Sequence, residues 1–314
     1  MTFPGFERVR LPVVAAPMFL VSGPELVVAA AKSGVIGSFP SPNCRTAADL
    51  DRWLGTITDQ LDPQTDAPWA INLVTHRSNT RLAEDLALVA EYQPEIVITA
   101  LGSPKPVMEV VKGYGGTVIA DVVSIALARK AVEAGVDGLA AVSAGAGGHT
   151  GHLSPFAFVS AIREFFDGIV TIGGGIADGH GIAGAIAAGA DLVYMGTRFL
   201  AAKESMAPEA YKQMIVDHGP DDLIVSDGIT GTDASWLRPS LLANGLDPDN
   251  LVKPGQRDYD SANASATRWK DLWAAGQGLQ VIRSIEPVAT IVDQLEQEYA
   301  AAAARFAEVT AATP

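Results

Sequence analysis

Eight short apolar runs, separated by segments with helical periodicity, constrain this chain more than any other feature of its sequence. The runs are VVAAPM (13–18), IGSFP (36–40), WAINLV (69–74), IVITAL (96–101), TVIADV (117–122), GLAAVSA (138–144), IVTIGGG (169–175) and LVYMGT (192–197). They do not alternate apolar with polar residues, which is typical of parallel strands buried on both faces. Eight strand–helix repeats close a (β/α)8 barrel, so we predict an α/β fold of the TIM-barrel type. A doubly wound open sheet is the alternative.

Capping residues set the expected helix boundaries between these runs. We expect the first helix to begin at a Ser22 cap and to end at Gly34. A second clear helix should span residues 124–135. Ser154 and Pro155 fit the N-cap and the first turn of the helix that follows the sixth run.

The repeat breaks after the eighth run, where residues 205–267 become irregular and rich in Gly, Pro and Asp. We interpret this segment as a small, mostly helical insertion, and residues 1–204 and 268–314 as the barrel. Because barrel active sites lie at the carboxyl ends of the strands, an insertion there should cover the site as a lid. We interpret its aromatic residues Trp236 and Tyr259 as packing rather than as substrate contacts.

Composition excludes several classes of partner. The 314 residues are 48% hydrophobic and carry a net charge of −14, which disfavours nucleic acid and anionic membrane surfaces. We find no uninterrupted apolar stretch of about 20 residues, so we predict no membrane span. Cys44 is the single cysteine, so no intramolecular disulfide forms, and we expect a cytoplasmic protein.

Two glycine-rich turns follow the seventh and eighth runs, GGGIADGHG (173–181) and MGTRF (195–199). Glycine after a strand lets a ligand approach the backbone closely, and the amides at the start of the next helix then point at an anion. The loops after strands seven and eight form the usual phosphate site of this barrel class. We therefore predict a phosphate-bearing ligand held by amides of Gly174, Gly175, Gly196 and Thr197.

A third glycine-rich loop, AGAGGHTGHLSP (144–155), carries two histidines just ahead of a helix start. The positive end of a helix favours a neutral imidazole, which can take a proton or orient an anionic substrate. The alternative is a surface loop whose histidines satisfy only local hydrogen bonds. His149 and His152 lie without nearby Cys or acidic ligands, so we expect no metal site.

Other barrel chemistries lack the residues that they need. No run contains a lysine for a Schiff base, and Cys44 follows the second run instead of standing on a catalytic loop. Asp121 is the one carboxylate clearly at a strand end, which is too few for a divalent-metal enzyme.

Six motifs in this order resemble the nitronate monooxygenase family, formerly called 2-nitropropane dioxygenases. They are APM (16–18), INL (71–73), AGAGGHTG (144–151), GGGIADG (173–179), YMGTRF (194–199) and AGQG (275–278). The resemblance covers nearly the whole chain. The superfamily also includes FMN-dependent enoyl-ACP reductases and NADH:quinone reductases.

The resemblance implies an FMN-bearing flavoprotein in which His149 is the catalytic residue. It implies that the two glycine turns hold the FMN phosphate and that the AGQG turn closes over the flavin. The cofactor-binding residues that it implies, together with those predicted above, are Pro17, Met18, Asn72, Gly148, Gly174, Gly175, Gly196, Thr197, Gly276, Gln277 and Gly278.

Two further residues stay open as substrate contacts. His152 is either a second polar group of the pocket or a cap of the following helix. Asp121 stands on the fifth run, where some quinone-reductase relatives carry a lysine near the flavin. A carboxylate there would not stabilise an anionic reduced flavin.

Three functions follow as expectations. The first is an oxidoreductase that converts alkyl nitronates or nitroalkanes with O2 to a carbonyl compound and nitrite. The second is an NAD(P)H-dependent reductase of quinones or enoyl thioesters. The third is a non-enzymatic barrel that binds a phosphorylated ligand. The sequence leaves a homodimer open.

Overall fold

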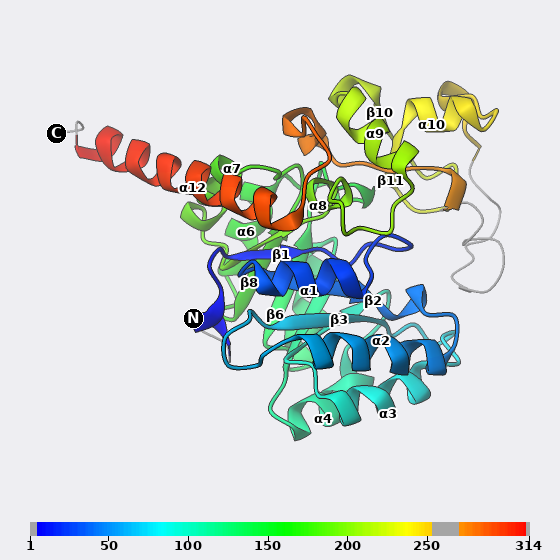
Figure 1. The fold of residues 1–314 in the computed structure, drawn as a ribbon, viewed down its shortest axis with the longest axis vertical. Helices are drawn as coiled ribbons and strands as arrows, with labels where there is room; N and C mark the ends of the chain where they lie inside the picture. Colours follow the sequence, from blue (N-terminus) through cyan, green and yellow to red (C-terminus); the bar gives the residue numbers. More distant parts are fainter. Residues whose placement is uncertain (1–4, 253–269, 312–314) are drawn as a thin grey trace.

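Eight parallel strands close into a barrel in the computed structural model, which describes residues 5–252 and 270–311 (Figure 1). In order around the barrel they are β1 (Val13–Ala15), β2 (Ile36–Pro40), β3 (Trp69–Val74), β4 (Ile96–Ala100), β5 (Thr117–Val122), β6 (Gly138–Val142), β8 (Ile169–Gly173) and β9 (Leu192–Met195). β1 pairs with both β2 and β9, so the sheet has no edge. The predicted barrel is therefore confirmed, and the open sheet is wrong.

Helices surround the barrel, as Figure 1 shows. They are α1 (Pro24–Lys32), α2 (Ala47–Gln60), α3 (Leu82–Tyr92), α4 (Lys105–Gly113), α5 (Ile125–Glu133), α6 (Pro155–Arg163), α7 (Gly179–Ala187) and α12 (Val288–Ala311). A one-turn helix, α8 (Thr197–Leu200), directly follows β9. Within the described residues, none of the helices is both long and apolar enough to cross a membrane.

The predicted cap at Ser154 is confirmed, because its side chain accepts a hydrogen bond from a backbone amide in the first turn of α6. Ser124 caps α5 in the same way, at the start of the helix predicted over residues 124–135. The prediction for Ser22 is wrong, because Gly23 is the N-cap of α1. The Ser22 hydroxyl instead accepts from the Met18 amide at 3.0 Å and so folds the loop that follows β1.

Two apolar layers hold the barrel together. One lies between the strands and the surrounding helices, and the other fills the barrel lumen. The buried lumen residues are Val14, Ile36, Ala70, Ile96, Ile98, Ile119, Ala140, Ile169, Leu192 and Tyr194. Because alternate residues of a strand face the same side, the next inward positions of β3, β5 and β8 toward their carboxyl ends are 72, 121 and 171. These three residues are polar.

The insertion after β9 contains strands that the sequence analysis did not foresee. Its elements are α9 (Glu209–Asp217), β10 (Leu223–Ser226), β11 (Ala234–Leu237) and α10 (Arg238–Ala243). β10, β11 and the two-residue β7 (Gly148–His149) form an antiparallel sheet. The insertion thus pairs directly with the histidine loop that follows β6.

Trp236 is the one of the two aromatic residues of the insertion that lies within the described residues. Trp236 is fully buried in a cluster with Ala234 and Leu241, which agrees with packing. Tyr259 lies outside the described residues, as does the boundary predicted between residues 267 and 268. The division of the chain at 204/205 and 267/268 stays a prediction.

Candidate active site

Glycine at the carboxyl end of β8 allows a close approach of two loops. Gly174 and Gly175 have φ angles of 151° and 70°. A Cβ on Gly174 would lie 2.0 Å from the Ser143 Oγ, which no side chain tolerates. The turn after β8 and the loop after β6 therefore touch at backbone distance, and only glycine fits.

Free backbone amides converge beside this turn. Among the described residues, the N–H groups of Gly174, Gly175, Gly196 and Thr197 have no hydrogen-bond acceptor. Thr197 is the first residue of α8, so its amide lies at the positive end of a helix. These are the four donors that the sequence predicts, and unpaired amides at strand ends suit an anion such as a phosphate.

The turn at residues 276–278 lies against both neighbouring loops. The Gly276 amide donates to the Thr197 Oγ1 at 2.9 Å, and the Gln277 amide donates to the Gly145 carbonyl at 2.9 Å. A Cβ on Gly278 would lie 2.9 Å from the carbonyl oxygen of Gly175. The structure therefore brings the AGQG turn to the same end of the barrel as the glycine loops.

Asn43 holds the loop after β1, and the sequence analysis did not single it out. Its Nδ2 donates to the Met18 carbonyl at 3.1 Å and to the Ser22 carbonyl at 2.7 Å. Its Oδ1 accepts from the amide of Leu20, which has a φ of 61°. One amide side chain thus fixes the loop of Pro17 and Met18. Its position just after the second run was the signal that could have found it.

The loop after β1 meets the end of β9 on the other side. A Cβ on Gly196 would be in ordinary contact with the Met18 Sδ at 3.6 Å. Met18 therefore lies beside Gly196.

The lumen beneath this end is polar. The Asn72 Nδ2 lies 3.4 Å from the Asp121 Oδ2 and 3.4 Å from the Ile98 carbonyl. Burial raises the pKa of Asp121 to about 7, although its interaction with the Tyr194 hydroxyl opposes that effect. A carboxyl in this place is largely an uncharged acid at pH below 7.

His149 lies at the same end, on β7. Its backbone pairs with Ala234 of β11, so the insertion holds the loop that carries it. Burial lowers the pKa of His149, which keeps the imidazole neutral. The neutral state was predicted, but the expected cause was the helix terminus and the structural cause is burial.

His152 is separated from this cluster. Its side chain is 83% exposed, and its Nε2 lies 3.2 Å from the Asp233 Oδ2. Ser154, not His152, caps α6, so the capping interpretation of His152 is wrong. The structure also gives it no contact with the residues that surround the strand ends.

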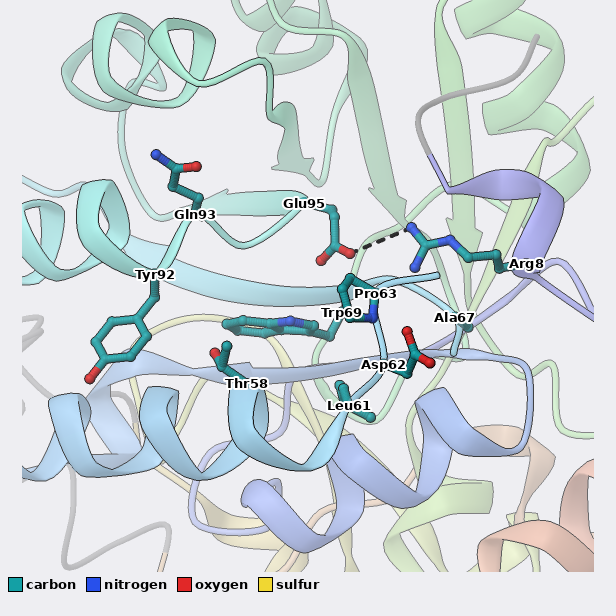
Figure 2. Close-up of a pocket in the computed structure, with 10 residues that line it drawn as sticks. All are labelled: Arg8, Thr58, Leu61, Asp62, Pro63, Ala67, Trp69, Tyr92, Gln93 and Glu95. Carbon is teal, nitrogen blue, oxygen red and sulfur yellow. Dashed lines mark ion pairs between the residues drawn. The ribbon is translucent and has the colours of Figure 1, made fainter. Parts of the chain in front are cut away.

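Two cavities lie elsewhere. The larger, about 280 Å³, is at the amino-terminal end of the strands, where the Trp69 indole lies near Tyr92 and an Arg8–Glu95 ion pair of 3.5 Å (Figure 2). A cavity of about 230 Å³ lies along α6 and α7 beside Phe156. The larger cavity contains none of the predicted site residues, and the smaller one contains only Gly174.

Comparison with known proteins decides the family. The family model of nitronate monooxygenase matches residues 75–298, which is more than half of the chain. This chain belongs to the nitronate monooxygenase family. The membership makes it a flavin-dependent oxidoreductase, and the predicted resemblance is confirmed.

Individual relatives of this chain carry different names. A nitronate monooxygenase of Paraburkholderia phytofirmans is 29% identical over 91% of this chain and 92% of its own length. The (3aS,4S,5R,7aS)-5-hydroxy-7a-methyl-1-oxo-octahydro-1H-indene-4-carboxyl-CoA dehydrogenase of Rhodococcus jostii is 32% identical over 74% of this chain. The matched region spans 64% of that dehydrogenase.

Solved structures share the fold. A nitroalkane oxidase from Streptomyces ansochromogenes has a TM-score of 0.81 at 23% identity and covers 96% of this chain and 99% of its own. FabK from Thermotoga maritima has a TM-score of 0.79 at 24% identity and covers 97% of both chains.

Proposed function

We propose that this protein is an FMN-dependent nitronate monooxygenase, which oxidises alkyl nitronates with O2 to a carbonyl compound and nitrite. The observation that carries the proposal is a neutral, partly buried His149 at the same barrel end as the unpaired amides of Gly174, Gly175, Gly196 and Thr197. The amides that could bind a phosphate and a side chain that could accept a proton then belong to one site. The match to a nitronate monooxygenase over 91% of this chain supports the same reaction.

The residues present fit a phosphorylated flavin. The four amides match a terminal phosphate, which accepts several hydrogen bonds. Pro17, Met18 and Asn72 would border the isoalloxazine, and the AGQG turn would cover it. Two buried polar atoms without a partner, Asp121 Oδ1 and Thr171 Oγ1, lie in the lumen below. Native interiors leave few such atoms, so a bound group or ordered water is expected to pair with them.

His149 would do the acid–base work. FMN, when bound, supplies electron transfer between the nitronate and O2. A neutral imidazole donates one hydrogen bond to the nitronate oxygens and so orients the anion. For a neutral nitroalkane the same group would remove the Cα proton, which its lowered pKa leaves it free to do at pH 7.

Nitrite release tests the proposal. Protein loaded with FMN should consume O2 and form nitrite and acetone from propane-2-nitronate, and it should do so without NAD(P)H. Loaded protein that leaves nitronates unchanged, while it reduces a quinone or an enoyl thioester with NAD(P)H, would contradict this function.

A second candidate function is a flavin-dependent dehydrogenase or reductase of a thioester substrate. The 32% identity with a carboxyl-CoA dehydrogenase favours it. This reaction differs from that of a nitronate monooxygenase in its electron donor or acceptor, because O2 would take no part in it. Products of a nitronate assay and of a coenzyme A thioester assay on one preparation separate the two.

A further inference from the structure

An acidic side chain lies inside the barrel near the carboxyl end of β5, and one of its two carboxyl oxygens has no hydrogen-bond partner. Asp121 is the fifth of six residues in β5, and its Oδ1 is buried without a hydrogen-bond partner. Its Oδ2 is 3.4 Å from the Asn72 amide, a long contact. Such an arrangement stabilises a carboxylate poorly, so it is not explained by packing or stability.

The neighbouring strands provide no positive charge. Asn72 approaches from β3, Thr171 and Tyr194 are the corresponding lumen residues of β8 and β9, and β6 places Ala140 opposite Asp121. Among the described residues, Tyr194 is the one titratable group that affects the pKa of Asp121, which burial raises to about 7. Asp121 therefore changes charge within the physiological pH range.

Asp121 lies in the barrel lumen, next to the strand ends that carry the predicted anion site. Gly174 follows Thr171 by three residues, and Gly196 follows Tyr194 by two. The loop of His149 follows β6, which is the hydrogen-bonded neighbour of β5. An ionised Asp121 therefore faces the same barrel end as the substrate anion, and like charges in a partly buried site repel each other.

We propose that Asp121 sets the pH range of substrate binding: as a neutral acid it lets an anionic substrate enter the site, and as a carboxylate it repels that anion. The role rests on the proposed function, since it presumes an anionic substrate beside the flavin. Above about pH 7, binding of one anion is then accompanied by the uptake of one proton by Asp121, and its release accompanies dissociation.

Nitrite is a suitable probe, because it is a small anion whose charge stays constant from about pH 6 to about pH 9. Its dissociation constant can be measured with FMN-loaded protein from the perturbation of flavin absorbance. For the wild type we expect affinity to fall about fivefold between pH 7 and pH 8, as the neutral acid becomes scarce. In Asp121→Asn, whose side chain is uncharged throughout, affinity should change far less.

Asp59→Asn is the matched control, since Asp59 is an exposed residue of α2. It should retain the wild-type pH dependence. Infrared difference spectra supply a second readout that needs no ligand. The carbonyl band of a protonated carboxyl should be present near pH 6, lost near pH 9, and missing from Asp121→Asn.

The outcomes separate the two proposals. Protein that takes up no FMN would overturn the proposed function. FMN-loaded protein that shows one pH dependence of nitrite affinity in the wild type and in Asp121→Asn would overturn the role of Asp121 alone. So would an absence of nitrite binding at every pH, or a wild-type infrared spectrum without the titrating band.

Discussion

His149 is the residue on which the proposed chemistry depends. A positioned general base contributes roughly 10²–10⁴-fold to proton transfer. We therefore expect His149→Ala to lower kcat/KM for a neutral nitroalkane by about 10² or more, with a smaller loss for the preformed nitronate. Flavin content should not change. His152→Ala is the control, because that histidine is exposed and should leave both rates at the wild-type level.

The pH profile of the nitroalkane reaction gives a second test at the same residue. A base must be unprotonated to act, and burial lowers the pKa of His149. Activity should therefore persist below the ordinary histidine pKa of about 6.5 and fall only at a lower pH. A loss of kcat/KM centred at or above 6.5 would contradict the assignment of His149 as a base with a lowered pKa.

Asp121 should make the stability of the flavin-free protein depend on pH. Its folded pKa, about 7, exceeds the unfolded value, so the folded state holds the proton more tightly. The contribution of the protonated form is complete below about pH 4 and is lost as the pH rises to 7. In urea titrations, the free energy of unfolding of Asp121→Asn should therefore rise relative to that of the wild type between about pH 4 and pH 7, by at most about 4 kcal/mol. If the difference in free energy of unfolding between the variant and the wild type did not change with pH, the raised pKa of Asp121 would be refuted.

At the scale of elements, the turn after β8 depends on the glycine at position 174. In Gly174→Ala, the new methyl group would meet Ser143 and the backbone of Ala144, so the turn after β8 must move. We expect the dissociation constant of FMN, measured by fluorescence, to rise at least about tenfold, since the turn carries two of the four amides. Gly245→Ala is the control: it also has a positive φ, of 73°, but open space around it. FMN binding should not change there.

Elements with a strong local signal could be predicted from the sequence. The eight continuous runs, the helix expected over residues 124–135 and the Ser154 cap lie close to where the sequence pattern predicts them. The strands of the insertion could not be predicted, because β7 contains only two residues and exists through its pairing with β11. Ser22 misled the prediction because a hydroxyl before a helix also suits a loop contact.

The site was predictable where glycine and histidine occur in ordered motifs, and not where it depends on contacts across the fold. The four amides come from two turns that each resemble a phosphate loop. Asn43 acts through a loop 21 to 25 residues earlier in the chain, which no local pattern reveals. The charge state of Asp121 depends on lumen neighbours from other strands.

At the scale of the whole molecule, the insertion and the barrel are joined through Tyr211. Its hydroxyl donates to the Ala274 carbonyl at 2.6 Å and accepts from the Ala274 amide at 3.0 Å, and its ring stacks on Trp273. Tyr211→Phe leaves two buried backbone groups unpaired. We expect the free energy of unfolding to fall by about 1–3 kcal/mol in urea titrations. FMN affinity should fall as well, since Ala274 leads into the AGQG turn.

The visible spectrum of the purified, FMN-loaded protein under anaerobic conditions tests the central claim most directly. The barrel that we describe as a nitronate monooxygenase should lose its oxidised flavin absorbance when propane-2-nitronate is added. It should keep that absorbance when NADH or NADPH is added. Prompt bleaching by a nicotinamide, with no response to the nitronate, would contradict the account and identify a reductase.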